Sequence, residues 1–93
     1  MTITVKFVGA LRNTSGAGIR VFNYEKCTVK DLIYRIIGES PEARRDLIAG
    51  ELKEPRTNAL ILVNGREISV LNGLETTLKD GDEVVFVPVV HGG

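Results

Sequence analysis

One segment of this chain has the spacing of a helix with a single apolar face. The apolar residues recur at intervals of three and four, at Val29, Leu32, Ile33, Ile36 and Ile37. Thr28 precedes this stripe and Asp31 follows three residues later, a variant of the capping box, so we expect the helix to begin here. Such a stripe needs a flat apolar surface to pack against, and the remainder of the chain must supply it as a sheet.

Strand patterns lie on both sides of this helix. Residues 2–7 alternate between apolar and polar side chains, and the alternation resumes at Ile19 after a turn-rich stretch, which predicts an amino-terminal hairpin. After the helix, Ala59–Val63 reads as an apolar strand ended by the turn Asn64-Gly65, with a short return strand over residues 66–68. Residues 83–88 form a last apolar strand.

A second, shorter helical segment is expected between these two halves. Gly38 is predicted to end the first helix, and Ser40 then precedes Pro41 as a cap precedes the first residue of a helix. The second helix should run from Pro41 to about Ile48. The whole pattern predicts an α+β fold, the β-grasp arrangement, with a mixed sheet of four to five strands packed on one main helix. We expect a β-grasp domain over residues 1–88 and a flexible tail over 89–93.

Composition excludes several classes of function. The 93 residues suffice for one domain, and twelve Lys and Arg balance twelve Asp and Glu, so we expect no direct binding of nucleic acid or of a membrane surface. Cys27 and His91 are the only cysteine and histidine, too few for a zinc site, and we predict no metal ligands. Without a disulfide or a run of ~18 apolar residues, the chain is expected in the cytoplasm.

No catalytic group is predicted in the chain. A lone His91 makes neither a nucleophile's base nor a metal site, and no serine, histidine and acid set can be assembled. Asp80 and Asp82 flank Gly81 and read as turn residues. Cys27 is interpreted as a buried apolar residue rather than a reactive thiol, since no neighbouring charge lowers its pKa.

The carboxyl-terminal stretch, residues 78–93, carries a family resemblance. Its leucine, Asp-Gly-Asp turn, apolar strand and final Gly92-Gly93 are similar to the ubiquitin-like sulfur carriers of the MoaD and ThiS families. The final His-Gly-Gly resembles the ubiquitin-related modifier and the archaeal small modifier proteins. The sequence has Val-Pro-Val-Val-His where MoaD proteins usually have Phe-Pro-Pro and a small residue, so the branch stays open.

The resemblance implies a carrier or substrate protein, and not an enzyme, whose Gly93 carboxylate is adenylated by a ubiquitin-activating-type adenylyltransferase. ATP and magnesium would be used by that enzyme, with no cofactor bound to the carrier. The product would be a thiocarboxylate, donating sulfur for molybdopterin synthesis or tRNA thiolation, or a chain conjugated to target lysines. The implied later partners are the large subunit of molybdopterin synthase, a thiotransferase, or lysine-bearing proteins.

Two surfaces are predicted to meet these partners. In the tail, Val89, Val90 and His91 precede the two glycines, which lack Cβ atoms and can thread a narrow channel. In the sheet, alternation predicts that one set of apolar side chains points away from the helix: Leu60, Leu62, Val85 and Val87. Other readings stay open: a register slip would exchange the two faces, a homodimer would cover one, or the tail is inert and the domain binds partners noncovalently.

Overall fold

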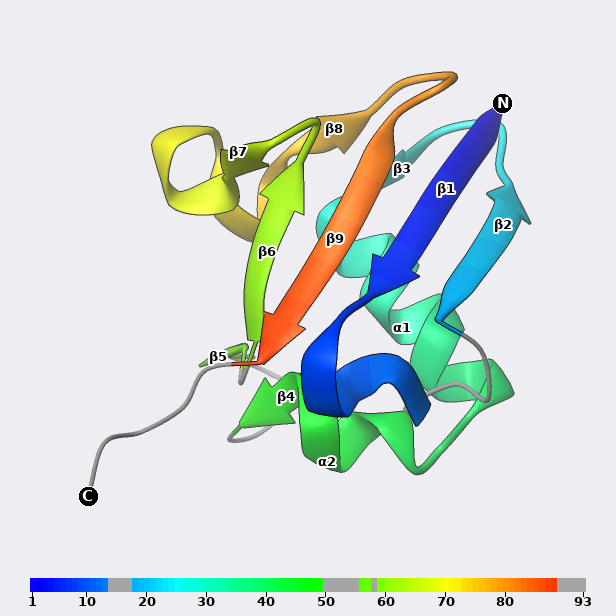
Figure 1. Ribbon diagram of the computed structural model, residues 1–93. Helices are drawn as coiled ribbons and strands as arrows, with labels where there is room; N and C mark the ends of the chain where they lie inside the picture. The colour runs from blue at the N-terminus through cyan, green and yellow to red at the C-terminus, as the bar shows by residue number, and fades with distance from the viewer. Residues whose placement is uncertain (14–17, 50–55, 58, 89–93) are drawn as a thin grey trace.

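A five-stranded mixed sheet forms one layer of the computed structural model, which describes residues 1–13, 18–49, 56, 57 and 59–88. The strand order is β2-β1-β9-β6-β7 (Figure 1). The bounds are β1 Thr2–Phe7, β2 Ile19–Asn23, β6 Ala59–Val63, β7 Arg66–Glu67 and β9 Glu83–Pro88. β9 runs parallel to β1 and antiparallel to β6, whereas β1 with β2 and β6 with β7 are antiparallel pairs. The predicted β-grasp fold is confirmed.

Helix α1, Val29–Glu39, packs behind this sheet and supplies the second layer (Figure 1). Its cap is the predicted one, because the Thr28 hydroxyl accepts a hydrogen bond from the Asp31 backbone N–H at 3.2 Å. The Asp31 carboxylate in turn accepts from the Thr28 backbone N–H at 2.9 Å. These two bonds satisfy donors that the helix start would otherwise leave unpaired.

Short elements connect the main ones. The helical ones are α2 Ala43–Leu47 and three 3-10 turns, η1 Gly9–Asn13, η2 Ile68–Val70 and η3 Gly73–Glu75. Two further pairs of short strands were not predicted from the sequence: β3 Cys27–Thr28 with β8 Thr77–Leu78, and β4 Ile48–Ala49 with β5 Arg56–Thr57.

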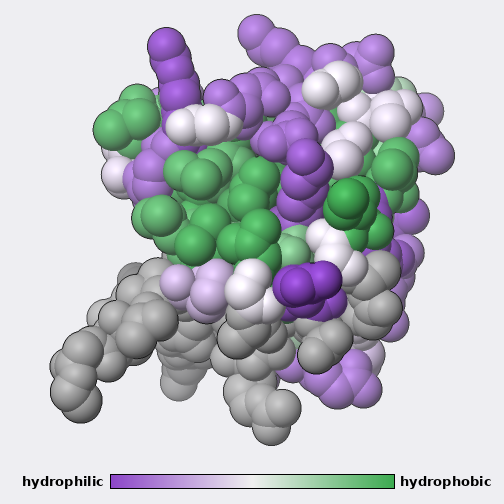
Figure 2. Space-filling model, viewed as in Figure 1, coloured by the Kyte–Doolittle hydropathy of each residue, from purple (hydrophilic) through white to green (hydrophobic). Residues whose placement is uncertain are grey.

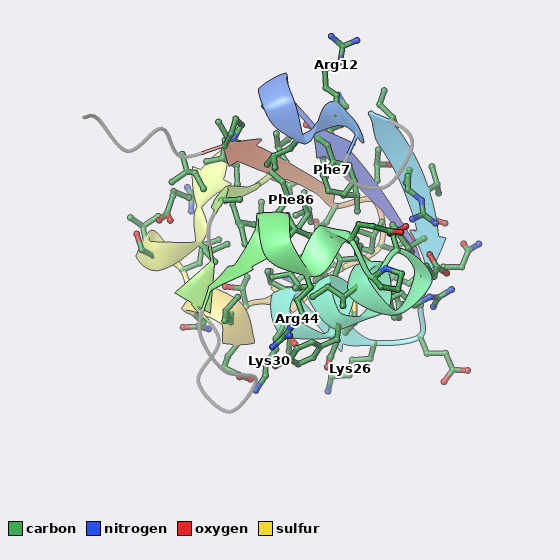
Figure 3. The ribbon with its side chains drawn as sticks, turned by 90° about the horizontal axis from the view of Figure 1, so that it is seen from below. Phe7, Arg12, Lys26, Lys30, Arg44 and Phe86 are labelled. Carbon is green, nitrogen blue, oxygen red and sulfur yellow. The ribbon has the colours of Figure 1, made fainter. Side chains whose placement is uncertain are left out.

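The core lies between the sheet and α1. The stripe residues Val29, Leu32, Ile33 and Ile36 are buried against the inward side chains of β1, β6 and β9. The rings of Phe7 and Phe86 stack with centroids 5.3 Å apart, and Figure 3 shows both directed from the sheet toward the helices. The two rings join the parallel strands β1 and β9 on their buried side.

The predicted boundaries are wrong at three places. α1 continues one residue past Gly38, and the Ser40 N–H donates to the Ile36 carbonyl at 2.8 Å to close its last turn. Ser40 therefore caps α1 rather than starting the next helix, and Pro41 lies in a turn before α2 begins at Ala43. The return strand stops at Glu67, because its carboxylate accepts the Ser69 N–H at 2.6 Å and starts η2 at Ile68.

Candidate functional site

The strand that leads into the predicted tail is held on both sides. β9 lies between β1 and β6, with Phe86 opposite Phe7 on one side and Pro88 opposite Ala59 on the other. β9 ends at Pro88, and the tail residues singled out from the sequence, Val89, Val90, His91, Gly92 and Gly93, lie outside the described residues. Whatever follows Pro88 therefore starts from a fixed strand in the middle of the sheet.

A glycine that the sequence analysis missed supports the end of this strand. Gly9 has φ +58°, and a Cβ atom on it would lie 3.1 Å from Cγ of Pro88. Its neighbour Val8 donates its N–H to the Phe86 carbonyl at 3.1 Å. Gly9 therefore lets the chain turn from β1 into η1 directly against the last residue of β9. A glycine just after an apolar strand was the only signal in the sequence.

The outer face of the sheet carries an apolar patch over β6 and β9, formed by Leu60, Leu62, Val85 and Val87 and called here the β6–β9 patch. Across the two strands Leu60 lies opposite Val87, and Leu62 lies opposite Val85. Leu60 is 39% exposed and the other three are half-buried. Figure 2 shows hydrophobic side chains gathered over these two strands on the face turned away from α1.

The alternation that predicted this patch is confirmed. The intervening residues of the same strands, Ile61, Val63, Val84 and Phe86, are all buried beneath the helix layer. The patch residues therefore face outward, and no slip of register exchanges the two sets. Their role in binding a partner stays a prediction.

A polar column separates the β6–β9 patch from a second apolar pair on the same face. Lys6 of β1 lies beside Val85, and its ammonium forms an ion pair with Glu83 at 3.0 Å. Beyond this column, Ile19 and Val21 on β2 are each 60% exposed. Figure 2 shows the same sequence of hydrophobic, hydrophilic and hydrophobic areas across the sheet. Neither the ion pair nor the second apolar pair was singled out from the sequence.

At the opposite end of β9, side chains of turn residues form hydrogen bonds to the ends of the neighbouring strands. Asn64 has φ +51°, its side-chain amide donates to Asp82 at 2.8 Å, and its oxygen accepts the Glu83 N–H at 2.9 Å. Asp82 also accepts the Lys79 N–H at 2.7 Å, and Asp80 accepts the Thr2 N–H at 2.7 Å. Asp80 and Asp82 are thus turn residues, as predicted. A hollow of about 370 Å³ beside them is lined in part by Asn64, Lys79 and Asp82.

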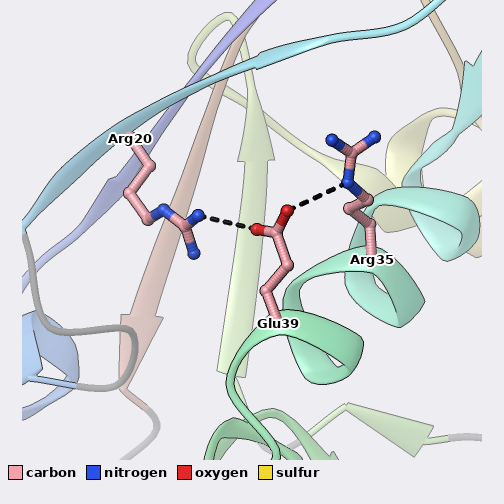
Figure 4. Close-up of polar contacts among 3 residues, drawn as sticks. All are labelled: Arg20, Arg35 and Glu39. Atoms are coloured by element: carbon pink, nitrogen blue, oxygen red, sulfur yellow. Dashed lines mark hydrogen bonds and ion pairs between the residues drawn. The ribbon is translucent and has the colours of Figure 1, made fainter.

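A charged cluster joins α1 to the edge of the sheet. The Glu39 carboxylate accepts from Nη2 of Arg20 on β2 at 2.6 Å and from Nε of Arg35 at 3.2 Å (Figure 4). These two bonds, that from Arg20 first, lower the pKa of Glu39, and the Glu39 carboxylate raises the pKa of Arg35. The guanidinium carbon of Arg20 lies 4.7 Å from the ring centre of Phe22, so cation and ring support each other.

Cys27 is buried in the described structure. Burial, and then the negative charge of Asp31, raise the pKa of its thiol, which favours the neutral form. The described residues contain no group of three or more His, Cys, Asp or Glu side chains able to hold a metal ion. Among the same residues, no helix has the length and apolar character needed to cross a membrane.

Comparison with known proteins gives matches along the whole chain. The ThiS family profile matches residues 5–93. Small archaeal modifier protein 3 of Haloferax volcanii is 34% identical over 99 aligned residues, covering all of both chains. The solution structure of small archaeal modifier protein 1 from Methanosarcina acetivorans superposes with a TM-score of 0.78 at 32% identity, covering 99% of this chain and 96% of that one. A chain of the BexX/CysO complex of Amycolatopsis orientalis superposes with a TM-score of 0.73 at 25% identity, covering 98% and 99%.

Proposed function

This chain belongs to the ThiS family of ubiquitin-like sulfur carriers and protein modifiers. We propose that its reacting group is the carboxylate of Gly93, which a partner enzyme activates. The observation that carries this proposal is the position of β9. The strand is paired on both sides and ends at Pro88, five residues before Gly93, and the family match continues through those five residues. The chain is a carrier rather than an enzyme, as its relatives are.

The chemistry requires a partner, because a carboxylate is a poor electrophile at neutral pH. On the activating enzyme, an oxygen of the Gly93 carboxylate attacks the α-phosphorus of ATP, and pyrophosphate leaves. A sulfur nucleophile then attacks the carbonyl carbon of this acyl adenylate, and AMP leaves. The product is a thiocarboxylate or a thioester, and each reacts further only when an acceptor is positioned beside it.

Gly92 and Gly93 suit this task because they have no side chains. An activating enzyme must keep water from the acyl adenylate, so the approach to its active site is expected to be narrow. Val89, Val90 and His91 would line the entrance of that channel while the folded domain stays outside. A methyl group at Gly93 should then obstruct the reacting carbonyl.

The β6–β9 patch is proposed as the surface that docks on the activating enzyme, an adenylyltransferase of the ubiquitin-activating type that uses ATP and magnesium. An apolar face rimmed by the Lys6–Glu83 ion pair is typical of a protein interface. The similar chain from Amycolatopsis orientalis is found in a complex with a partner, which supports a partner-dependent function. Later acceptors are proposed to be the large subunit of molybdopterin synthase, a thiotransferase or target lysines. The buried free thiol of Cys27 fits a reducing cytoplasm.

The test is to incubate the purified chain with ATP, magnesium and the cognate activating enzyme and to measure intact mass. We expect an adenylate, a thiocarboxylate or a conjugate on the chain that ends in Gly93. We expect none of these on a chain lacking Gly92 and Gly93, and a much slower reaction for Gly93→Ala.

The competing function is a noncovalent binding module with an inert tail. It predicts no change of mass with any activating enzyme, and cells in which deletion of Gly92 and Gly93 has no effect. To divide sulfur transfer from conjugation, the protein is recovered from its own cells and the group on Gly93 is identified. Sulfur supports a carrier, the ε-amine of a lysine supports a modifier, and both together support a dual role.

A further inference from the structure

Strand β2 presents an unpaired edge of the main sheet. Within the described residues β1 is the only strand that pairs with β2. The Phe7 N–H donates to the Gly18 carbonyl at 2.8 Å, and the Tyr24 N–H donates to the Met1 carbonyl at 2.9 Å. Antiparallel pairing alternates, so even-numbered residues of β2 bond to β1. The backbone N–H and C=O groups of Ile19, Val21 and Asn23 therefore point away from the sheet.

The outer side of this edge is apolar. Ile19 and Val21 have their side chains on the outer face, and each is 60% exposed. Proteins usually protect an exposed edge strand with charged side chains, proline or a bulge, because the free backbone groups pair with other chains. On this outer face β2 offers two branched apolar side chains beside its open backbone groups, and its charged side chain, Arg20, lies on the inner face instead.

The inner side of the same edge is cationic. Arg20 points to this side from β2, and Arg35 reaches it from α1, where its guanidinium carbon lies 5.0 Å from the ring centre of Tyr24. Glu39 accepts from one nitrogen of each guanidinium, and a guanidinium has five N–H donors. The next acidic side chain along α1, Asp31, is bonded to the helix start. In the cluster formed by described side chains, two guanidinium groups thus share one carboxylate beside the edge.

We propose that the β2 edge binds an extended peptide in which apolar and acidic residues alternate. The peptide would add a strand, bonding to the backbone of Ile19, Val21 and Asn23. Its apolar side chains would then pack beside Ile19 and Val21 on the outer face. Its acidic side chains would meet Arg20 and Arg35 on the helix side, where a planar guanidinium binds a carboxylate through two parallel hydrogen bonds.

The charge at this edge favours such a peptide over a second copy of the chain. If two β2 strands paired around Val21, each Arg20 would lie beside the Phe22 of the other copy on the helix side. Four guanidinium groups would then gather around two Glu39 carboxylates. Like charges gathered in one place oppose the association of two copies, whereas an acidic peptide would neutralise the excess positive charge.

The experiment is a titration of the isotope-labelled full chain with a ten-residue peptide of alternating valine and glutamate, followed by amide NMR. We expect the largest shifts at Ile19, Val21 and Asn23, with slower amide exchange at the same positions. A peptide with lysine in place of glutamate should bind at least tenfold more weakly. Arg35→Glu should weaken binding of the acidic peptide at least tenfold, while Arg66→Glu, on the far edge strand β7, should leave it unchanged.

A backbone variant tests the added strand itself. Val21→Pro removes an outward N–H without breaking a bond to β1, and it should abolish peptide binding; Val21→Thr keeps the N–H and should retain it. Unchanged amide signals of β9 would show that each variant is folded. Equal affinity for the two peptides, shifts centred on β6 and β9, or no binding at millimolar peptide would each overturn the proposal. So would protection of the β2 amides that rises with protein concentration alone, the sign of a second copy.

Discussion

Gly9 is the residue that lets η1 pack directly against the end of β9. An L-residue at its φ of +58° is disfavoured by about 1–2 kcal/mol, and the contact of a Cβ with Pro88 at 3.1 Å adds to this. We expect Gly9→Ala to lower the free energy of unfolding by at least that amount, measured by urea denaturation. Gly38→Ala is the matched control, because among the described residues an added Cβ would meet no atom within 4 Å beyond its chain neighbours and its own helix backbone. It should stabilise the chain by roughly 0.5–1 kcal/mol, since alanine is the better helix former. Equal effects at both glycines would contradict the role given to Gly9.

Glu39 should make stability depend on pH in the acid range. Hydrogen bonds from Arg20 and then Arg35 lower the pKa of its carboxyl below the usual 4.5. Because the unfolded chain binds a proton more readily there, this stability is present above pH 4.5 and is lost as the pH falls through the lowered pKa. Glu39→Gln should therefore flatten the acid limb of the urea midpoint plotted against pH. Glu42→Gln, in the exposed turn before α2, should leave that limb unchanged.

At the scale of elements, side-chain hydrogen bonds of Asn64 join the β6–β7 turn to the start of β9. Asn64→Ala would lose two side-chain hydrogen bonds and a residue tolerant of φ +51°. We expect a loss of about 1–3 kcal/mol in the free energy of unfolding. Asn72→Ala is the matched control, because Asn72 also precedes a glycine but its side chain makes no capping bond. It should change stability by less than ~0.5 kcal/mol.

The hydrogen bonds of Asn64 and the tail lie at opposite ends of β9. A change at Asn64 should therefore affect stability but not the adenylation rate. Asn64→Ala should unfold more readily yet be adenylated at the parental rate under conditions in which it is folded. A loss of adenylation that exceeds the unfolded fraction would contradict this separation.

Helices and strands were predictable from the sequence where the apolar residues of a segment followed a single regular spacing. The apolar stripe and the Thr28 cap fixed α1, and alternation fixed the inward and outward sets of β6 and β9, as the burial of Ile61 and Phe86 confirms. The short pair β3–β8 was not predictable, since two residues carry no period and Cys27 finds its partner Leu78 only in the folded chain. The predicted start of α2 was wrong because Ser40 could cap either the end of α1 or the start of the next helix, and in the structure it caps α1.

The candidate site likewise has parts that the sequence predicted and parts that it did not. The β6–β9 patch followed from alternation within two strands. Arg35 and Glu39 have the i, i+4 spacing of a helix pair, but the bond from Arg20 joins a strand to a helix and has no pattern in the sequence. Gly9 was likewise missed, because its meaning depends on Pro88, which lies far away along the chain and is its neighbour in space.

At the scale of the whole molecule, the sheet offers two apolar areas that should serve different partners. The β6–β9 patch lies on the strands that lead to the tail, whereas Ile19 and Val21 lie beyond the Lys6–Glu83 column on the edge strand. Leu60→Lys places a charge in the first area at a residue that is 39% exposed, so the fold should be retained. In adenylation by the cognate enzyme, we expect KM for this variant to rise at least tenfold and kcat to stay within twofold, because only docking is weakened.

Val21→Lys is the control that makes this prediction specific. It places the same charge on the same face of the sheet, at a residue that is 60% exposed, but on the far side of β1. The KM of Val21→Lys should match that of the parent chain. Its affinity for the acidic peptide, in contrast, should differ from that of the parent chain. If both lysine variants raised KM equally, the enzyme would cover the entire face and the two areas would be one interface. A fall in kcat with Leu60→Lys would mean that the patch positions the tail during chemistry, in addition to holding the domain on the enzyme.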